Sequence, residues 1–273
     1  MWNAATVSEM FHDAKQFGFE VDGYRFNWKK LKDMRDAYIT RLNGIYTRLL
    51  GNSEVEYING YGSFTGEKSV EVDGVEYTAE HIMIAVGGTP ALPDIPGIEH
   101  AISSDGFFLL DEQPRNVAVV GAGYIGVELA GVFQALGTSA EIFTRGDTIL
   151  RGFDDLIVDT LLSEMEKQGL KHRPNQSPAQ IIQHDDGTKF IKTQAGDTFG
   201  PYDQVLFATG RKPLIDKLGL DNANVKLTDK GYISVNDKQE TSTSQVYALG
   251  DVCGDVELTP MAIAAGRRLA DRL

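Results

Sequence analysis

One stretch of the chain, residues 117–128 with the sequence VAVVGAGYIGVE, constrains the fold more than any other. Four apolar residues run directly into three glycines at the spacing Gly-x-Gly-x-x-Gly, which are Gly121, Gly123 and Gly126. Apolar residues then recur every three or four positions as far as Gly137, which is the period of a helix. This order predicts a strand, a tight turn and a helix, the first part of a doubly wound α/β fold.

The three glycines have the spacing of a dinucleotide-binding turn. Gly121 permits the tight turn, Gly123 lets the backbone approach a pyrophosphate, and Gly126 lets the helix lie close to the strand. The free N–H groups of the first helical turn would then bind phosphate oxygens. An ordinary strand-to-helix turn is the alternative, because the pattern is short, but the strand before it and the helix after it favour a dinucleotide.

The whole chain is predicted to form parts of two domains. Residues 1–113 are interpreted as part of one domain with a proline-rich connector, residues 114–233 as the dinucleotide domain, and residues 234–273 as a return to the first domain. In the dinucleotide domain, strands and helices alternate, and the pair Asp186-Gly187 marks a hairpin. We therefore expect a mostly parallel sheet with an antiparallel insert.

The flanking parts have periodic patterns of their own. Residues 3–18 and 27–51 are predicted to be helices whose apolar sides face a core. Residues 54–85 change to a period of two, which predicts short strands. Near the C-terminus, Thr259 is predicted to be the N-cap and Pro260 the first residue of a last helix.

The charge and the cysteine content exclude several classes of protein. A formal net charge of −13 argues against nucleic acid or an anionic membrane as a partner. No apolar run approaches the roughly 18 residues of a membrane span, and the first residues lack the basic and apolar parts of a secretory signal. The single cysteine, Cys253, excludes an internal disulfide or dithiol couple and fits a reducing compartment, so we expect a cytoplasmic location.

The end of the second strand of the dinucleotide domain favours NADP over NAD. An NAD site has an acidic residue about 20 positions after the glycines, and Glu141 is near that count, but it lies in the middle of the predicted strand. The strand instead ends at Thr144 and Arg145, with Arg151 nearby, and guanidinium groups bind a 2′-phosphate well. Solvated surface arginines are the alternative, and Gly126 points weakly to NAD, since NADP sites often have alanine there.

Further motifs show a resemblance to a known family. They are HIMIAVGGTPALPDIPGIE, SDGFF, ATGRKP, GYISV, YALGDVCG and ELTPMAIAAGRRLADRL, together with the glycine turn and the arginine pair. With these residues the sequence resembles the glutathione reductases, which are flavin-dependent pyridine nucleotide–disulfide oxidoreductases, over essentially its whole length. The last motif and the arginine pair point to this branch over the lipoamide and mercuric relatives.

The resemblance implies two cofactors, NADPH and FAD, and a set of residues for each. The NADPH set comprises the glycine turn, the arginine pair and three later positions: Gly121, Ala122, Gly123, Tyr124, Ile125, Gly126, Glu128, Arg145, Arg151, Gly210, Arg211 and Glu257. The FAD set comprises Gly62, Gly87, Asp251, Leu258 and Thr259. The two-domain architecture implied is Rossmann-like, with one FAD-binding and one NADPH-binding domain.

The resemblance also implies roles for single residues. Tyr124 would be an aromatic gate over the nicotinamide pocket, and Glu257 would face the nicotinamide. Gly62 would meet the FAD adenine through its backbone, and Asp251 would hydrogen-bond the ribityl side of the flavin. Thr259 would present its backbone N–H to the flavin, where the positive end of the last helix stabilises the reduced, anionic ring.

Simpler structural roles are the alternatives for several of these residues. Gly87 is also compatible with an ordinary glycine-rich turn, Asp251 with a turn residue and Thr259 with a helix cap alone. Tyr124 is also compatible with core packing. Cys253, without a partner thiol, is expected to be inert.

The resemblance implies an enzyme that passes hydride from NADPH to FAD and then electrons to glutathione disulfide, as a homodimer. We expect this chain to be a central fragment of such an enzyme, with the FAD-binding βαβ motif and the redox cysteine pair before it and the dimerisation domain, with the catalytic histidine, after it. The FAD domain would then be incomplete, and no catalytic residue is expected in the chain. The alternative functions are another disulfide reductase of the same family and, for the chain itself, an NADPH-binding module without turnover.

Overall fold

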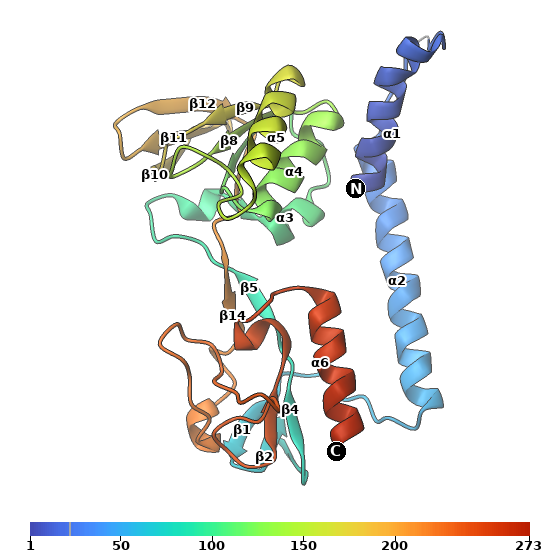
Figure 1. Cartoon of the computed structure of the whole chain (residues 1–273), viewed down its shortest axis with the longest axis vertical. Helices are drawn as coiled ribbons and strands as arrows, with labels where there is room; N and C mark the ends of the chain where they lie inside the picture. The colour runs from blue at the N-terminus through green and yellow to red at the C-terminus, as the bar shows by residue number, and fades with distance from the viewer. Residues whose placement is uncertain (22) are drawn as a thin grey trace. The chain divides into compact units, whose positions relative to one another are not determined.

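The structure, a computed structural model, describes residues 1–21 and 23–273, which form two compact units (Figure 1). Unit 1 consists of Met1–Asn43 and Pro90–Gly210, and unit 2 consists of Gly44–Thr89 and Arg211–Leu273. Both units contain helices and strands, so the α/β class expected from the sequence is confirmed.

Unit 1 is built on a parallel sheet of five strands in the order β6-β13-β7-β8-β9. The strands are β6 (Ile102–Ser103), β13 (Gln204–Phe207), β7 (Asn116–Val120), β8 (Ser139–Phe143) and β9 (Lys171–Arg173). The chain runs from β7 through β8 to β9 in one direction and returns as β13 on the other side of β7. This is the doubly wound arrangement that the sequence predicted.

Helices bury an apolar core against this sheet. They include α3 (Ser104–Leu109), α4 (Tyr124–Ala135) and α5 (Asp155–Lys167). Phe133 of α4 and Ile142 of β8 have no exposed surface. The core of unit 1 therefore lies directly beneath the helix that follows the glycine turn.

An antiparallel meander forms the insert predicted for unit 1. Its strands are β10 (Pro178–Gln183), β11 (Lys189–Thr193) and β12 (Thr198–Tyr202), with the short 3₁₀ helix η2 (Ile98–His100) packed on the first. Asp186 and Gly187 lie in the loop between the first two strands, as predicted, and the side chain of Asp186 accepts a hydrogen bond from the N–H of Thr188 at 2.9 Å.

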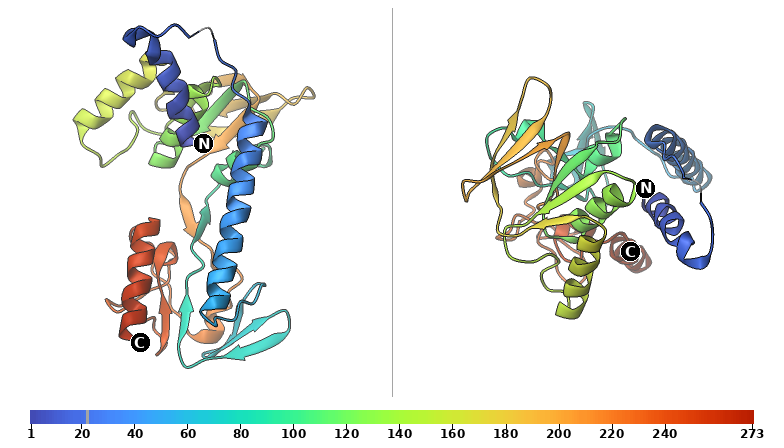
Figure 2. Two further views of the ribbon diagram at one scale, coloured as in Figure 1. Left: turned by 90° about the vertical axis from the view of Figure 1, so that its right-hand side faces the viewer. Right: turned by 90° about the horizontal axis from the view of Figure 1, so that it is seen from above.

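Two long helices of the N-terminal region lie on unit 1 or begin on it. They are α1 (Trp2–Asp13), continued by the 3₁₀ helix η1 (Ala14–Phe17), and α2 (Trp28–Asn52). Helix α1 lies beside α4 (Figure 2), and the hydroxyl of Ser8 donates to the carbonyl of Ala135 at 2.6 Å. Asn27 caps α2, since its side chain accepts a hydrogen bond from the N–H of Lys30 at 2.8 Å.

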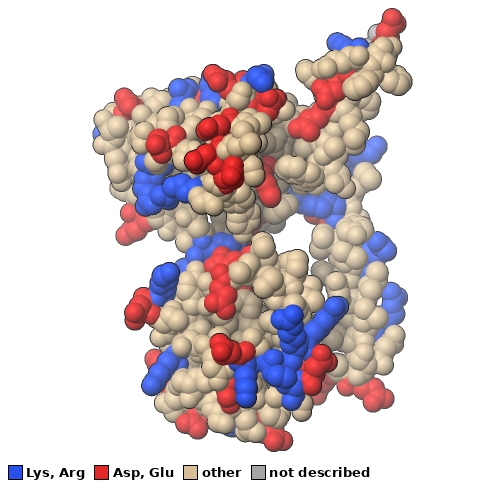
Figure 3. Space-filling view, in the orientation of Figure 1, with Lys and Arg blue, Asp and Glu red and all other residues tan. Residues whose placement is uncertain are grey.

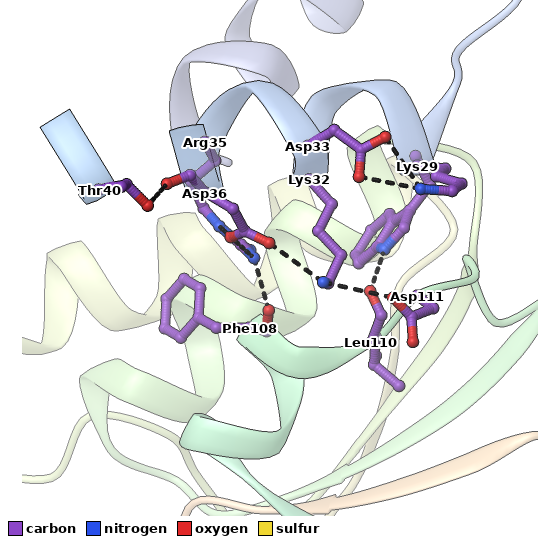
Figure 4. A network of polar contacts seen from close by, with 10 residues as sticks. Lys29, Lys32, Asp33, Arg35, Asp36, Thr40, Phe108, Leu110 and Asp111 are labelled. Atoms are coloured by element: carbon purple, nitrogen blue, oxygen red, sulfur yellow. Dashed lines mark hydrogen bonds and ion pairs between the residues drawn. The ribbon is translucent and has the colours of Figure 1, made fainter. Parts of the chain in front are cut away.

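The first turns of α2 are fixed to the core of unit 1. The ring of Trp28 stacks on Phe133 with centroids 5.9 Å apart, and its Nε1–H donates to the carbonyl of Leu110 at 2.9 Å. About two turns further on, Arg35 donates to the carbonyl of Phe108 at 2.6 Å (Figure 4). These contacts join residues more than 70 positions apart in the sequence.

The compact units differ from the domain boundaries expected from the sequence. Residues 1–43 belong to unit 1 rather than to the unit of residues 44–89, because α1 and Trp28 pack on it. Unit 1 also ends at Gly210 instead of residue 233, because Leu218 and Ile233 lie in the apolar core of unit 2. A periodic pattern shows which side of an element is apolar, but it does not show which partner covers that side.

Most of the apolar side of α2 is not part of a core, contrary to the prediction. Within α2, all of whose residues are described, Trp28 alone is buried. Met34, Tyr38 and Leu49 are each more than half exposed. The spacing of the apolar residues therefore predicted the helix correctly and its burial wrongly.

Unit 2 contains an antiparallel meander and two short two-stranded sheets. The meander consists of β1 (Ser63–Gly66), β2 (Ser69–Val72) and β3 (Val75–Thr78), and the sheets pair β4 (Ile82–Ile84) with β15 (Val246–Ala248) and β5 (Gly88–Pro90) with β14 (Arg211–Pro213). The remaining elements are η3 (Leu220–Ala223), η4 (Gly250–Cys253) and α6 (Thr259–Arg272). The strands expected from residue 54 onward begin only at Ser63, so the first part of that prediction is wrong.

No helix in the described part of the chain is both long and apolar enough to cross a membrane. Acidic and basic side chains are interspersed over the face seen in Figure 3. Among residues 1–21 and 23–273, no group of histidine, cysteine and acidic side chains is arranged to hold a metal ion.

Candidate functional site

The glycine turn lies at the carboxyl edge of the parallel sheet of unit 1. Val120 at the end of β7 pairs with Phe143 of β8 on one side and with Phe207 of β13 on the other. Just beyond these residues, the N–H of Gly121 donates to the carbonyl of Phe143 at 3.0 Å, and the N–H of Ala208 donates to the carbonyl of Val120 at 2.7 Å. The three strands therefore end together, where open α/β sheets bind their ligands.

The three glycines of the turn have different surroundings. Gly121 has a φ of +143°, and a Cβ atom there would overlap the carbonyl of Ala208. A Cβ atom on Gly126 would lie 2.7 Å from the carbonyl oxygen of Gly121, whereas one on Gly123 would meet no atom within 4 Å. Packing therefore requires glycine at the first and third positions whichever cofactor binds. At Gly123 the missing side chain leaves open space, which a pyrophosphate would use.

The N-terminus of α4 is free to bind an anion. The helix begins at Tyr124 with Gly123 as its N-cap, no side chain caps it, and its first turn has no acidic residue. The first N–H groups and the positive end of the helix dipole therefore favour a phosphate. Tyr124 is 43% exposed, which excludes a place in the core, and Glu128 is exposed as well, whereas Ile125 packs partly against the core.

A loop between the two candidate arginines returns to the glycine turn. Arg145 is the second residue after β8, and the N–H of Leu150, beside Arg151, donates to the carbonyl of Ala122 at 2.6 Å. Leu150 has a φ of +48°, a left-handed conformation that costs a residue with a side chain about 1–2 kcal/mol. Burial of its side chain and the hydrogen bond to Ala122 hold it there. The loop is thus fixed against the turn.

Neither candidate arginine has a partner in the part of the protein that the structure describes. Within the described ranges 1–21 and 23–273, the side chains of Arg145 and Arg151 form no hydrogen bond or ion pair, and both residues are exposed. Acidic residues outnumber basic ones by 39 to 26 in this chain, so partners are plentiful elsewhere. Two unpaired guanidinium groups beside an open helix N-terminus are suited to a bound anion.

Glu141, the acidic residue at the count expected for NAD, is bound by other side chains. Arg173 donates to its carboxylate at 2.9 and 3.2 Å, and the hydroxyl of Tyr202 donates at 2.9 Å. Burial alone would raise the pKa of Glu141, but the hydrogen bonds from Arg173 and Tyr202 hold this pKa below its usual value. The carboxylate is therefore ionised and occupied, in the middle of β8 instead of at its carboxyl end.

In unit 2, two candidates for the flavin lie near each other. Gly87 has a left-handed backbone conformation, with a φ of +72°. The next residue, Gly88, lies close to Asp251: a Cβ atom built on Gly88 would be 3.6 Å from the Cβ atom of Asp251. Arg211 donates to the carbonyl of Gly88 at 2.6 Å, and its Nε lies 3.9 Å from an Asp251 carboxylate oxygen. Arg211, expected near NADPH, therefore contacts the flavin candidates of its own unit, whereas the preceding Gly210, with a φ of +138°, belongs to unit 1.

The remaining candidates of unit 2 lie at the start of α6 and on the meander. Thr259 is the first helical residue and Leu258 the N-cap, so the prediction of Thr259 as N-cap is wrong by one position. No side chain caps this helix, and its N-terminus is therefore open as well. Glu257 accepts a hydrogen bond from the hydroxyl of Tyr232 at 3.0 Å, and Gly62 lies against β2.

The single cysteine has the properties of an inert residue. Cys253 lies in η4 and is partly buried. Burial, with a smaller contribution from the charge of Asp255, raises the pKa of the thiol to about 11. The thiol is therefore protonated at neutral pH, and the protonated form is a poor nucleophile.

Comparison with known proteins defines the family. Residues 2–266 match the family of pyridine nucleotide-disulphide oxidoreductases. The chain belongs to this family. A pyridine nucleotide-disulphide oxidoreductase has the doubly wound architecture described above, and the fold predicted from the glycine motif is confirmed.

Two members of the family with high similarity are glutathione reductases of yeasts. The protein of Yarrowia lipolytica (strain CLIB 122 / E 150) is 43% identical over 289 residues, covering 100% of this chain and 62% of that protein. The protein of Schizosaccharomyces pombe (strain 972 / ATCC 24843) is 46% identical over 282 residues, covering 100% and 61%. The resemblance to glutathione reductases inferred from the motifs is thus confirmed, and the chain spans about three fifths of the length of these relatives.

Solved structures of a bacterial flavoprotein disulfide reductase share the fold. The HOCl-induced flavoprotein disulfide reductase RclA from Escherichia coli superimposes with a TM-score of 0.86 at 25% identity, covering 96% of this chain and 59% of that one. Its Cu(II) complex gives a TM-score of 0.86 at 24% identity, covering 98% and 60%.

Three residues that shape the candidate site were not among the sequence candidates. Leu150 connects the arginine loop to the glycine turn, His172 contacts Thr144 beside Arg145, and Tyr232 holds Glu257. Leu150 and His172 belong to no motif, Tyr232 lies in the motif GYISV without having been a site candidate, and each of the three acts on a partner distant in the sequence. A leucine carries no signal for a left-handed conformation, so only the tertiary structure reveals its role.

Proposed function

We propose that this chain binds NADPH in unit 1 and FAD in unit 2 as part of an NADPH-dependent glutathione-disulfide reductase of the cytoplasm. The observation that carries the proposal is the pair of arginines, Arg145 and Arg151, which have no partner among the described residues and lie near the carboxyl end of β8, beside the open glycine turn. Among nicotinamide dinucleotides, only NADP carries a 2′-phosphate, and two guanidinium groups match its charge and geometry.

The residues of both units fit the two cofactors. In unit 1, Gly121, Gly123 and Gly126 leave the backbone and the N-terminus of α4 open to a pyrophosphate. In unit 2, the open N-terminus of α6 at Thr259 is suited to an anionic ring, and Asp251 is held near Gly88. When bound, NADPH supplies hydride and FAD accepts it and transfers electrons to a disulfide.

The glutathione branch is supported by the two yeast relatives that carry this name. Their identities of 43% and 46% extend over the whole chain, well above the 25% of the bacterial flavoprotein disulfide reductase. We propose glutathione disulfide as the substrate and a homodimer as the working assembly, by analogy with this branch. Another disulfide as substrate remains the alternative.

We propose that the 273-residue chain on its own binds NADPH without reducing glutathione disulfide. The sequence holds one cysteine, whereas a dithiol couple needs two, and the pKa of that thiol is raised to about 11. NADPH oxidation is followed by absorbance with and without glutathione disulfide, and NADPH binding is measured by calorimetry on the same preparation. Turnover dependent on glutathione disulfide would contradict this proposal.

The cofactor preference is tested by Arg145→Ala. Loss of a charged hydrogen bond costs about 1.5–3 kcal/mol, so NADPH affinity should fall roughly 10–150-fold while NADH affinity changes little. Arg115→Ala is the matched control, because Arg115 is an exposed arginine just before β7, at the opposite edge of the same sheet. Equal weakening of NADPH and NADH by Arg145→Ala would refute the role at the 2′-phosphate.

A further inference from the structure

A buried threonine forms a hydrogen bond across Arg145, the candidate arginine of the 2′-phosphate site. Thr144 is 1% exposed, and its hydroxyl donates to the carbonyl of Gly146 at 2.8 Å, so that the hydrogen bond spans Arg145. Because the hydroxyl has only one proton, its oxygen accepts at the other contact, which is with Nε2 of His172 at 2.8 Å. His172 thus donates through Nε2–H, and the chain of contacts runs from β9 to the backbone on both sides of Arg145.

The backbone around Arg145 is fixed by further hydrogen bonds from the same region. The N–H of Thr144 donates to the carbonyl of Arg173 at 3.1 Å, and the N–H of Gln176 donates to the carbonyl of Thr144 at 2.9 Å. The carbonyl of Gly146 also accepts from a backbone N–H of the loop after β9, at 2.9 Å. The residues before and after Arg145 are therefore held, whereas its guanidinium group is free within the described chain.

The ring of His172 is suited to a fixed hydrogen bond. His172 lies on β9 and is partly buried, and this burial lowers its pKa below the usual value. The neutral ring with its proton on Nε2 donates to Thr144 without adding a charge beneath the arginine. Leucine at this position would leave the oxygen of Thr144 with one partner fewer.

We propose that Thr144 and His172 form a positioning pair that makes the site prefer NADPH over NADH, by holding the backbone that carries Arg145. This inference rests on the proposed binding of NADPH. A guanidinium group on a fixed backbone binds a phosphate with less loss of conformational freedom than one on a mobile loop. Because NADH has no 2′-phosphate, its affinity does not depend on this order.

A merely structural role for the pair gives a different result. Loss of a buried hydrogen bond that only stabilises the fold weakens both cofactors equally or neither. Loss of backbone order at Arg145 weakens NADPH alone. The informative quantity is therefore the ratio of the two dissociation constants, with thermal unfolding measured separately on each variant.

The test compares two buried threonines of unit 1 in the full chain. Thr144→Val removes the hydroxyl and keeps the shape of the side chain, and it should reduce the preference for NADPH about 5–30-fold, the factor that corresponds to ordering one residue. Thr193→Val is the matched control, because Thr193 is 2% exposed and its hydroxyl bonds only within the meander, to the carbonyl of Asp197. The control should leave the ratio unchanged.

A second pair of variants tests the histidine. His172→Leu should reduce the preference in the same way, and His172→Gln should restore most of it, because the amide Nε2 carries a donor at a similar distance along the side chain. NADPH and NADH are titrated separately at one salt concentration. These variants also provide the test if Thr144→Val does not fold.

The outcomes separate this inference from the proposed function. If Arg145→Ala lowers the preference but Thr144→Val and His172→Leu do not, the positioning role is refuted and NADPH binding stands. If Arg145→Ala leaves the preference unchanged, the 2′-phosphate site itself is refuted. If Thr193→Val changes the ratio as much as Thr144→Val does, the effect is a general loss of stability and the positioning role is overturned.

Discussion

Replacing Gly126 with alanine tests how closely α4 packs on the glycine turn. A Cβ atom on Gly126 would lie 2.7 Å from the carbonyl oxygen of Gly121 and 3.3 Å from its carbonyl carbon. These are backbone atoms that cannot rotate away, so the helix or the turn must shift. Gly131, in the same helix, is the matched control, because a Cβ atom there would meet nothing within 4 Å.

The difference between the two variants isolates the steric cost. Alanine in place of glycine in a helix interior contributes about 0.8–1 kcal/mol of stability through its helix propensity, a gain that applies in full to Gly131 and at most to the same extent to Gly126 in the first turn. Only Gly126→Ala adds overpacking, which costs about 1–3 kcal/mol. We therefore expect Gly131→Ala to be more stable than the unmodified chain, and Gly126→Ala to be less stable than Gly131→Ala by about 1–3 kcal/mol.

The assay can report on unit 1 alone. The chain has two tryptophans, Trp2 and Trp28, and both lie in unit 1. Urea unfolding followed by tryptophan fluorescence therefore measures the unit that contains α4. NADPH affinity should also fall in Gly126→Ala, because the turn that moves is the one proposed to bind the pyrophosphate. Equal stability of the two variants would show that α4 does not press on the turn and would refute the argument.

Two further predictions concern the core of unit 1. Glu141→Gln should destabilise it by about 1.5–3 kcal/mol at neutral pH, through loss of the charged partner of Arg173. The fold lowers the pKa of Glu141 below 4.5, so the stability difference between the unmodified chain and Glu141→Gln should be complete above pH 4.5 and should decline as the pH falls further. Urea unfolding of both chains across this pH range measures the difference. A difference that stays constant would contradict the prediction. Trp28→Ala should lower the free energy of unfolding by about 3–5 kcal/mol, because Trp28 is buried. Trp2→Ala, at a residue that is 60% exposed, should change it by less than about 0.5 kcal/mol. Thermal unfolding followed by circular dichroism measures both. Similar effects of the two substitutions would show that residues 1–43 do not belong to unit 1.

Several structural roles weighed for the candidate residues are decided by the structure. Tyr124 is too exposed for a core residue, and the side chain of Thr259 does not cap its helix. The carboxylate of Asp251 lies beside the guanidinium group of Arg211. The assignment of these residues to NADPH and FAD stays a prediction that the binding experiments test.

The sequence by itself determined most of the elements and the position of the glycine turn. These features depend on short-range rules: a run of apolar residues predicts a strand, a period of three to four predicts a helix, and glycine at 121 and 126 allows the turn and the close helix. The hairpin at Asp186-Gly187 is of the same kind, since Gly187 has a φ of +83°, in the left-handed region that glycine adopts readily. Each of these predictions needed only neighbouring residues.

The tertiary structure alone decided which distant residues meet. It placed Trp28 on Phe133, paired Glu141 with Arg173 and Tyr202, and set His172 against Thr144. It also left most of the apolar side of α2 exposed, which its periodicity did not predict. The physical reason is that periodicity and local conformation are properties of neighbouring residues, whereas burial, pKa and hydrogen-bond partners depend on segments that folding brings together.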